Sequence, residues 1–539
     1  MKRRDFLKTA ALGVAAIISG PAIAVASPDV PARPFRVRRF ELDELTIGQL
    51  QAGLASGRFT DVSLTEKYLA RIEELDRSGP RLRSIIELNP DALPIARALG
   101  RERKARGPRG PLHGIPMLVK DNIGTHDRMS TTAGSLALAG AIAPRDAFLS
   151  DRLRAAGAVI LGKTNLSEWA NFRSTHSTSG WSGRGGQTRN PYVLDRNPSG
   201  SSSGSAVAVA ANLCAAAVGT ETDGSILSPS SYNGVVGVKP TLGLISRAGI
   251  IPIAHSQDTA GPMARTVTDA AILLGCLAGL DPNVSSDQMR DRNASTNYNV
   301  FLDRDGLRGA RLGVARKFFG IHPAADRLIE TAIEEMKRRG AVVIDPADLP
   351  THGQFDDSED EVLHYEFKAD INSYLAGLGP QAPMHSLRDL IAFNEANRDR
   401  EMPFFGQEIF LQAEAKGPLT EKAYRDALEK NHRLARKEGI DTLMSRYQLD
   451  AIIAPTAGPA HVTDYVYGDR DTGSSTTPAA VAGYPSVTVP AGFVCGLPVG
   501  ISFFGRAWSE PMLLKLAYAF EQSTKFRTPP RFLPTVSAA

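Results

Sequence analysis

The sequence has little cysteine and little excess charge. Three thiols, Cys214, Cys276 and Cys495, are spread over 539 residues, and no CxxC or other metal-ligand spacing occurs. The sequence therefore predicts neither a disulfide framework nor a metal site. The 62 basic residues nearly balance the 58 acidic ones, leaving a net charge of +4. Without a long basic tract, a nucleic-acid partner is not expected.

The N-terminus has the pattern of an export signal. Arg3 and Arg4 precede an apolar run that extends to about Ala26 and contains two small-x-small sites near its end, as signal peptides do. The paired arginines resemble a twin-arginine signal. The alternative is an uncleaved membrane anchor, for which the run is short. We expect residues 1–26 to be a signal peptide, and the mature protein to be periplasmic or secreted without stable membrane association.

The order of apolar and charged segments predicts an α/β protein. Short apolar runs typical of buried strands occur at GIPMLVKD (114–121), AGAVILGK (156–163) and PSVTVP (485–490). Between them, residues at about 280–445 carry charged helical patterns, including an acidic run at 356–361 that we expect to be a solvated face. These patterns predict a single domain over 27–539 with a helical insertion or flank.

Two familiar motifs match the sequence but lack their usual surroundings. GAVILGKT (157–164) satisfies the Walker A pattern, but its central residues are strand-like, whereas a phosphate-binding loop needs a flexible turn. Lys163 is therefore interpreted as a strand-end lysine. GSSSG (200–204) satisfies the nucleophile elbow of α/β-hydrolases, with Ser202 as nucleophile and His255 as a candidate base. No strand-like run precedes it, so an elbow and a plain Gly/Ser linker both stay open.

A third, dispersed pattern is more specific. Lys120 follows GIPMLV, a Gly/Ser loop occupies 200–205, and Ser225 stands in GTETDGSI, 24 residues after Ser201. This arrangement resembles the amidase signature family, whose hallmark is a Gly/Ser-rich loop followed 24 residues later by a nucleophilic serine, with a lysine upstream in a GIPxxxKD context. The resemblance continues through QDTAGPMAR (257–265). It implies a central mixed β-sheet covered by helices on both faces, and hydrolysis of carboxamide C–N bonds.

The resemblance assigns a Ser-cisSer-Lys triad to Ser225, Ser201 and Lys120. Ser225 would attack the amide carbonyl while Ser201 accepts its proton and passes one to Lys120. A free lysine has a pKa of about 10.4, so only about one in 2,500 is neutral at pH 7. Burial lowers a lysine pKa by up to about 3 to 5 units. We therefore expect Lys120 to be desolvated, and Asp121, its neighbour on an extended segment, to point away from it.

The resemblance also assigns an oxyanion hole to four successive backbone N–H groups, those of Thr222, Asp223, Gly224 and Ser225. Such donors stabilise the tetrahedral intermediate of acyl transfer. The commoner family pattern is GTDxGGSIR. Here Glu221 replaces an aspartate, Asp223 replaces a glycine and Leu227 replaces an arginine. We expect a stiffer loop with a carboxylate near the oxyanion, and a pocket that does not use that arginine.

The substrate class is suggested by NLSEWANFRS (165–174), GWSGRGGQTRNPY (180–192) and GTETDGSI together. The combination is similar to bacterial peptide amidases, which release the C-terminal amide nitrogen of peptides as ammonia. A broad-specificity amidase for small aliphatic or aryl amides is the alternative; a tRNA-dependent amidotransferase subunit and a non-catalytic binding protein on the same scaffold are others. Candidate pocket-wall residues, although aromatics at such positions often belong to a core, are Trp169, Asn171, Phe172, Trp181 and Arg184. No cofactor is implied, and we expect a monomer whose partner is a peptide or small-molecule amide.

Overall fold

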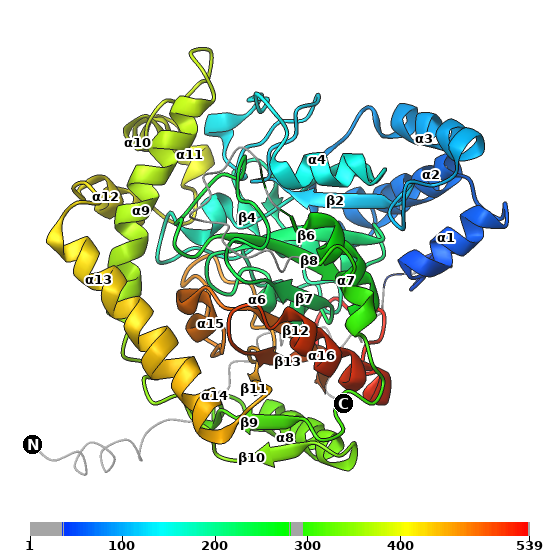
Figure 1. Cartoon of the computed structure of the whole chain (residues 1–539). Helices are drawn as coiled ribbons and strands as arrows, with labels where there is room; N and C mark the ends of the chain where they lie inside the picture. Colours follow the sequence, from blue (N-terminus) through cyan, green and yellow to red (C-terminus); the bar gives the residue numbers. More distant parts are fainter. Residues whose placement is uncertain (1–34, 36, 280, 282–294, 537–539) are drawn as a thin grey trace, which may run out of the picture. The chain divides into compact units, whose positions relative to one another are not determined.

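A mixed β-sheet forms the centre of the protein (Figure 1). The computed structural model describes residues 35, 37–279, 281 and 295–536, so the expected export signal at 1–26 lies outside the described residues. Within this part of the chain the sheet contains eleven strands in the order β1-β3-β2-β6-β8-β7-β12-β13-β11-β9-β10. Their bounds are β1 (Ile85–Leu88), β2 (Pro116–Lys120), β3 (Val159–Thr164), β6 (Ala216–Glu221), β7 (Val236–Lys239), β8 (Thr259–Ala264), β9 (Arg311–Val314), β10 (Val342–Ile344), β11 (Ala451–Pro455), β12 (Ser486–Val494) and β13 (Leu497–Phe504).

The sheet combines parallel and antiparallel pairs. β2 runs parallel to both β3 and β6, and β9 runs parallel to β10 and β11. The strands between these groups are antiparallel, from β6 through β8, β7 and β12 to β13. A separate small sheet pairs β4 (Trp181–Ser182) with β5 (Gly186–Gln187). The parallel pairing of β2 and β6 matters most for function, because it brings the carboxyl ends of both strands to the same edge.

Helices flank the sheet, in agreement with the α/β prediction (Figure 1). In chain order they are α1 (Ile47–Ala55), α2 (Asp61–Ile72), α3 (Ala92–Arg106), α4 (Phe148–Ala155), α5 (Ser203–Ala210), α6 (Leu227–Tyr232), α7 (Val267–Leu277), α8 (Pro323–Arg338), α9 (Asp356–Gly377), α10 (Leu387–Ala396), α11 (Arg398–Glu401), α12 (Glu408–Glu414), α13 (Lys422–His432), α14 (Asp441–Tyr447), α15 (Thr477–Ala482) and α16 (Glu510–Thr524). Among the described residues, none of these helices has the length and apolar character needed to cross a bilayer.

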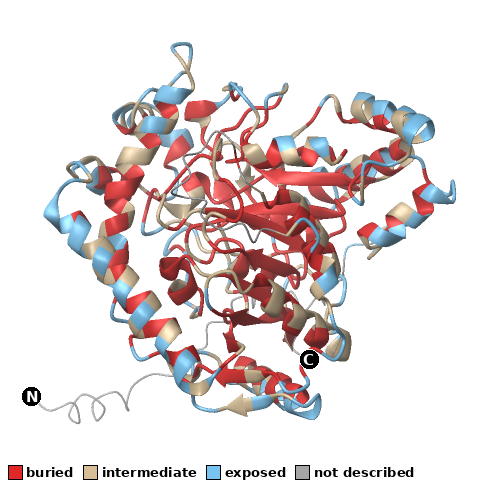
Figure 2. Ribbon diagram, in the orientation of Figure 1, coloured by how far each residue is buried: buried red, intermediate tan, exposed pale blue. Residues whose placement is uncertain are grey.

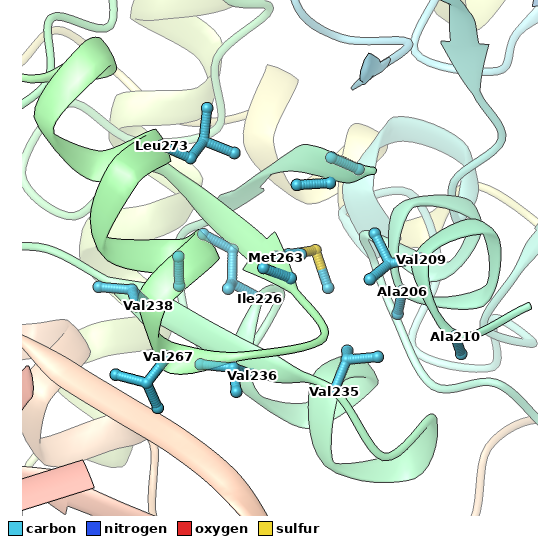
Figure 3. Close-up of a cluster of buried hydrophobic side chains, with 14 of the residues drawn as sticks. Ala206, Val209, Ala210, Ile226, Val235, Val236, Val238, Met263, Val267 and Leu273 are labelled. Carbon is cyan, nitrogen blue, oxygen red and sulfur yellow. The ribbon is translucent and has the colours of Figure 1, made fainter. Parts of the chain in front are cut away.

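The core lies where the central strands meet the small-residue helix α5. Figure 3 shows apolar side chains of α5, β7, β8 and α7 gathered in one cluster, together with Ile226, the residue after Ser225. The central strands are buried almost throughout, whereas α9 and α13 alternate buried and exposed positions (Figure 2). The burial of apolar surface stabilises this cluster by about 25 cal/mol of free energy per Å². Because Ile226 belongs to the cluster, the turn that carries Ser225 is anchored to the core.

The helical middle of the chain differs in two respects from its prediction. Most of residues 295–445 is helical, as expected, but β9 and β10 also lie here and extend the main sheet at its edge. The acidic run at 356–361 opens α9, and within it Ser358 and Glu359 are buried. Glu359 accepts a hydrogen bond from Gln257 Nε2 at 2.8 Å. Sequence alone gave no sign of this partner, so the solvated-face prediction was wrong for that residue.

Candidate active site

Strand β2 delivers Lys120 into a dry environment. The strand is buried along its whole length and Lys120, its last residue, has no exposed surface. Its Nζ lies 2.7 Å from Ser201 Oγ, 2.9 Å from Thr220 Oγ1 and 3.2 Å from the Thr220 carbonyl oxygen. Burial lowers the pKa of Lys120 to about 7, although the negative charges of Asp258 and Glu221 act in the opposite direction. The desolvated lysine expected from the sequence is present.

Asp121 takes part in a different set of contacts, as the extended backbone predicts. Its carboxylate accepts a hydrogen bond from Thr132 Oγ1 and lies 3.6 Å from Arg184 Nη1. Lys163 provides a further nearby positive charge. None of these partners contacts Lys120 Nζ, whose hydrogen-bond partners come from the serine loop and β6. The charge of Asp121 is therefore balanced elsewhere and does not hold Lys120 protonated.

The serine loop is tied to both β6 and the turn that follows it. Ser201 and Ser202 are fully buried, and the Gly200–Ser201 peptide bond is cis. Ser202 Oγ donates to the Thr220 carbonyl at 3.0 Å, and its backbone N–H donates to the Ser225 carbonyl at 3.1 Å. At Gly204 there is no room for a side chain, because a Cβ would lie 2.2 Å from the Ser84 carbonyl oxygen. The small residues of the loop thus permit its close packing.

Ser225 follows a tight turn with unused backbone donors. Gly224 has a φ of +74°, a conformation that favours glycine. Glu221 Oε2 accepts hydrogen bonds from the N–H groups of Ile226 and Leu227, at 2.6 and 2.9 Å. The four N–H groups from Thr222 to Ser225 lie in the described part of the chain, outside regular strands and helices. None of them donates a hydrogen bond to another backbone group. A run of four such donors can bind an oxyanion.

The two acidic replacements in this turn have defined partners. Glu221 caps the start of α6, as its bonds to Ile226 and Leu227 show. The Asp223 carboxylate accepts hydrogen bonds of 2.6 Å from the hydroxyls of both Thr476 and Thr477. Burial raises the pKa of Asp223, while those hydroxyls act in the opposite direction. The turn is thus fixed from the side of α15.

The three predicted triad residues are brought together, but their hydroxyl relay is incomplete in this conformation. Lys120 and Ser201 are hydrogen-bonded, and backbone bonds connect the serine loop to Ser225. No hydrogen bond between Ser201 Oγ and Ser225 Oγ occurs among the described residues. Ser225 keeps 8% of its surface exposed, whereas Ser201 keeps none. Ser225 is therefore the hydroxyl of the pair that solvent reaches.

A small pocket opens beside Ser201. Its lining comes from six segments that no local sequence pattern joins, namely Asn122, Ala170, Ser201, Thr220, Thr222, Ile250, Ile251, Ile253, Asp258 and Thr259. Asp258 Oδ1 accepts a 2.6 Å hydrogen bond from Thr222 Oγ1, and burial raises the pKa of Asp258 to about 6. Of the polar residues that sequence reasoning did not single out, Asn122 directly follows GIPMLVKD and Asp258 belongs to QDTAGPMAR.

The five candidate wall residues lie outside this pocket. Trp169 and Phe172 belong to a hydrophobic cluster with Phe367 of α9. Trp181 packs edge-on against Phe405. The remaining two make polar contacts: Arg184 pairs with Glu87, and Asn171 donates to Ser177 and Ser179. None of the five lines the pocket beside Ser201, where the neighbouring Ala170 does, so the aromatic residues serve packing.

The two competing motif interpretations are wrong. Residues 159–164 form strand β3, and Lys163 Nζ donates to the Ile123 carbonyl and to Thr131 Oγ1 at 2.6 and 2.8 Å. A strand cannot wrap phosphates as a Walker A loop does. No regular strand leads into GSSSG either. His255, the candidate base for Ser202, is instead bonded to Asp370 at 3.0 Å.

Comparisons with known proteins agree with this geometry. Residues 63–514 match the family described as Amidase. A probable amidase of Arabidopsis thaliana is 44% identical over 92% of this chain and 93% of its own. The native peptide amidase of Stenotrophomonas maltophilia is 52% identical, with a TM-score of 0.87 over 92% of this chain and all of that one. A peptide amidase bound to the competitive inhibitor chymostatin is 53% identical, with a TM-score of 0.88 over 91% of this chain and all of that one.

The fold, the buried lysine beside a serine loop and these similarities agree with one another. The chain is an enzyme that hydrolyses amides, and it belongs to the amidase signature family.

Proposed function

We propose that this amidase converts the C-terminal amides of peptides to free acids and ammonia through an acyl-enzyme on Ser225. The observation that carries the chemistry is the 2.7 Å contact between Lys120 Nζ and Ser201 Oγ, two residues that have no exposed surface. The observation that favours peptide amides is the identity of 52–53%, over nearly the whole chain, with proteins described as peptide amidases.

The surroundings of Lys120 can satisfy a neutral amine. A neutral amine has two N–H donors and one lone pair. The two donors match the Thr220 carbonyl and Thr220 Oγ1, at 3.2 and 2.9 Å. The lone pair then faces Ser201 Oγ, whose O–H can donate to it. With a pKa of about 7, about half of the amine is neutral at pH 7. Lys120 is thus suited to act as the ultimate base.

The reaction then proceeds in two halves. Ser225 Oγ attacks the amide carbonyl as its proton passes to Ser201, and Ser201 passes its own proton to Lys120. The carbonyl oxygen becomes an oxyanion, for which the free N–H groups of residues 222–225 are suitable donors. When the C–N bond breaks, the proton returns through Ser201 to the leaving nitrogen. Water then repeats the sequence on the acyl-enzyme and releases the acid.

An ammonia-release assay tests the substrate class. The panel contains a short peptide amide, the same peptide as free acid, an internal peptide bond, acetamide and benzamide. We expect release from the peptide amide at a kcat/KM at least tenfold above either simple amide, and none from the free acid. Good turnover of simple amides with untouched peptide amides would instead assign the broad-specificity activity.

We further propose export of the mature enzyme. The paired Arg3 and Arg4 ahead of an apolar run support this. Replacing both arginines with lysine should leave the precursor inside the cell, as fractionation and immunoblotting would detect. Unchanged export of that variant would contradict a twin-arginine route.

A further inference from the structure

The pocket beside Ser201 is lined by two hydrogen-bond acceptors whose acceptor sites are not all used within the protein. Asn122 is 3% exposed, and its Oδ1 has no hydrogen-bond partner, although its Nδ2 donates to Thr220 Oγ1 at 2.9 Å. Asp258 accepts bonds from Thr222 Oγ1 and from the N–H groups of Ile253 and Ala254. A carboxylate has about four acceptor sites, so one remains. A buried, unpartnered carbonyl is costly, and because Asn122 lines the pocket, a ligand bound there that donates a hydrogen bond can satisfy it.

The rest of the lining limits the size of such a ligand. Ala170, Ile250, Ile251 and Ile253 supply apolar walls. The enclosed space has room for about one water-sized molecule. An amide nitrogen with two hydrogens, or ammonia, has that size and donates N–H groups. A methylated nitrogen is larger and has one donor fewer.

The chemistry of the leaving group places it at the same point. In the proposed reaction Ser201 protonates the departing nitrogen, so that nitrogen must lie within hydrogen-bonding distance of Ser201 Oγ. Ser201 is part of the pocket wall, whereas Ser225 is not. The side of the triad that faces the pocket is therefore the side from which the leaving group departs and the hydrolytic water later enters.

We propose that this pocket is the leaving-group subsite, in which Asn122 Oδ1 and Asp258 accept hydrogen bonds from the carboxamide nitrogen and the apolar walls exclude substituted nitrogens. This inference rests on the proposed function. During acylation the Ser225 Oγ–C bond forms and the C–N bond breaks. The proton that left Ser225 reaches the nitrogen through Ser201, so the NH₂ group departs as NH₃. The subsite thereby restricts the enzyme to unsubstituted carboxamides.

The test compares a peptide amide with its N-methylamide, both with the same acyl group. For the wild-type enzyme we expect kcat/KM to be at least 100-fold lower for the N-methylamide. In Asn122→Ala, the primary amide should lose about tenfold or more, and the ratio of N-methylamide to primary-amide activity should rise at least tenfold. Ile253→Ala keeps both acceptors but widens the pocket, so it should raise the ratio with a smaller loss on the primary amide.

Asn394→Ala is the matched control. Asn394 in α10 is also buried with an unpartnered Oδ1 and a bonded Nδ2, but it contacts Gln407 and does not line the pocket. Its substitution should leave the ratio unchanged. If the wild type does not hydrolyse the primary amide, the proposed function fails. If it does, but Asn122→Ala and Ile253→Ala have the same ratio as Asn394→Ala, the amidase stands and the subsite is wrong.

Discussion

The side chains of Lys120 and Ser201 meet at 2.7 Å, although 81 residues separate them in the sequence. Two features of the fold produce this contact. β2 and β6 are parallel neighbours, so Lys120 and Thr220 both lie near the same edge of the sheet. The serine loop is then bonded to Thr220 through Ser202. The contact is dry because the whole of β2 is buried.

Removing either end of the relay should abolish turnover. Ser225→Ala removes the attacking oxygen, and Lys120→Met removes the final proton acceptor while keeping a similar volume. We expect both to lower kcat by at least about 10⁴-fold on the peptide amide, as losses within a triad do. Ammonia release under single-turnover conditions measures this. A Lys120→Met enzyme with more than a tenth of wild-type activity would mean that another group accepts the proton.

The pH profile of kcat/KM should report the pKa of Lys120. Because burial lowers the pKa of Lys120 to about 7 and only the neutral amine accepts a proton, kcat/KM should rise with unit slope below about pH 7 and level off above it. Initial rates between pH 5 and 9 test this. A profile that keeps rising to pH 10 would show a lysine with an ordinary pKa.

Protein stability should show the cost of burying Lys120. Its folded pKa of about 7 lies below the unfolded value of 10.5, so the unfolded chain binds more protons between these limits. The wild type should therefore lose stability relative to Lys120→Met as the pH falls from 10.5 to 7, by up to about 1.4 kcal/mol per pH unit. Urea unfolding of both proteins at several pH values measures the difference. A pH-independent difference would contradict the shifted pKa.

Gly224 is expected to be needed for its backbone conformation. A Cβ there would lie 3.0 Å from Thr476 Oγ1, and the φ of +74° disfavours L side chains by roughly 1–2 kcal/mol. Gly224→Ala should therefore move the N–H donors and lower kcat on the order of 10²-fold, with little change in KM. Gly57→Ala is the control, because Gly57 has a similar φ of +77° and open space around it. An equal effect of both substitutions on kcat would contradict the proposal that the turn at Gly224 positions N–H donors for the oxyanion.

His255 is predicted to stabilise the fold without taking part in the chemistry. Its two ring nitrogens face different carboxylates, Asp370 at 3.0 Å and Glu366 at 3.3 Å. Burial and Arg247 lower its pKa, but these carboxylates outweigh them and the pKa is raised. The ion pairs therefore stabilise the folded state below about pH 6.5, and this contribution is lost as the pH rises through the raised value.

His255→Asn should accordingly lower Tm more at pH 6 than at pH 8, and kcat by less than tenfold. EDTA should leave turnover unchanged, because no step of the proposed reaction uses a metal. A loss of kcat in His255→Asn as large as that in Ser225→Ala would assign His255 a catalytic role. Activity that is lost with EDTA and restored by zinc would show that the reaction uses a metal.

The sequence predicted the local elements better than the assembly. β2, β3 and α5 follow from short apolar or small-residue runs whose neighbours along the chain determine their structure. The dispersed spacing of Lys120, Ser201 and Ser225 predicted their proximity only through the family resemblance.

What could not be predicted depends on contacts between distant segments. Asn122 and Asp258 share a pocket because β2 and β8 both flank β6, a pairing that no local pattern encodes. Glu359 carries no signal of burial within an acidic run, since its partner Gln257 lies 102 residues away. For Trp169 and Phe172 the sequence left a substrate wall and a core position both open, and α9 supplies the apolar surface that covers them.

The most direct test is the titration of Lys120 itself. Protein labelled with ¹³C at the lysine Cε can be followed by NMR between pH 5 and 11, with Lys120→Met to assign the signal. We predict a signal that titrates at about pH 7, well below those of the exposed lysines, and that is missing from the variant. A Lys120 signal that titrates near pH 10.4, with the exposed lysines, would contradict a neutral amine as the base of this enzyme.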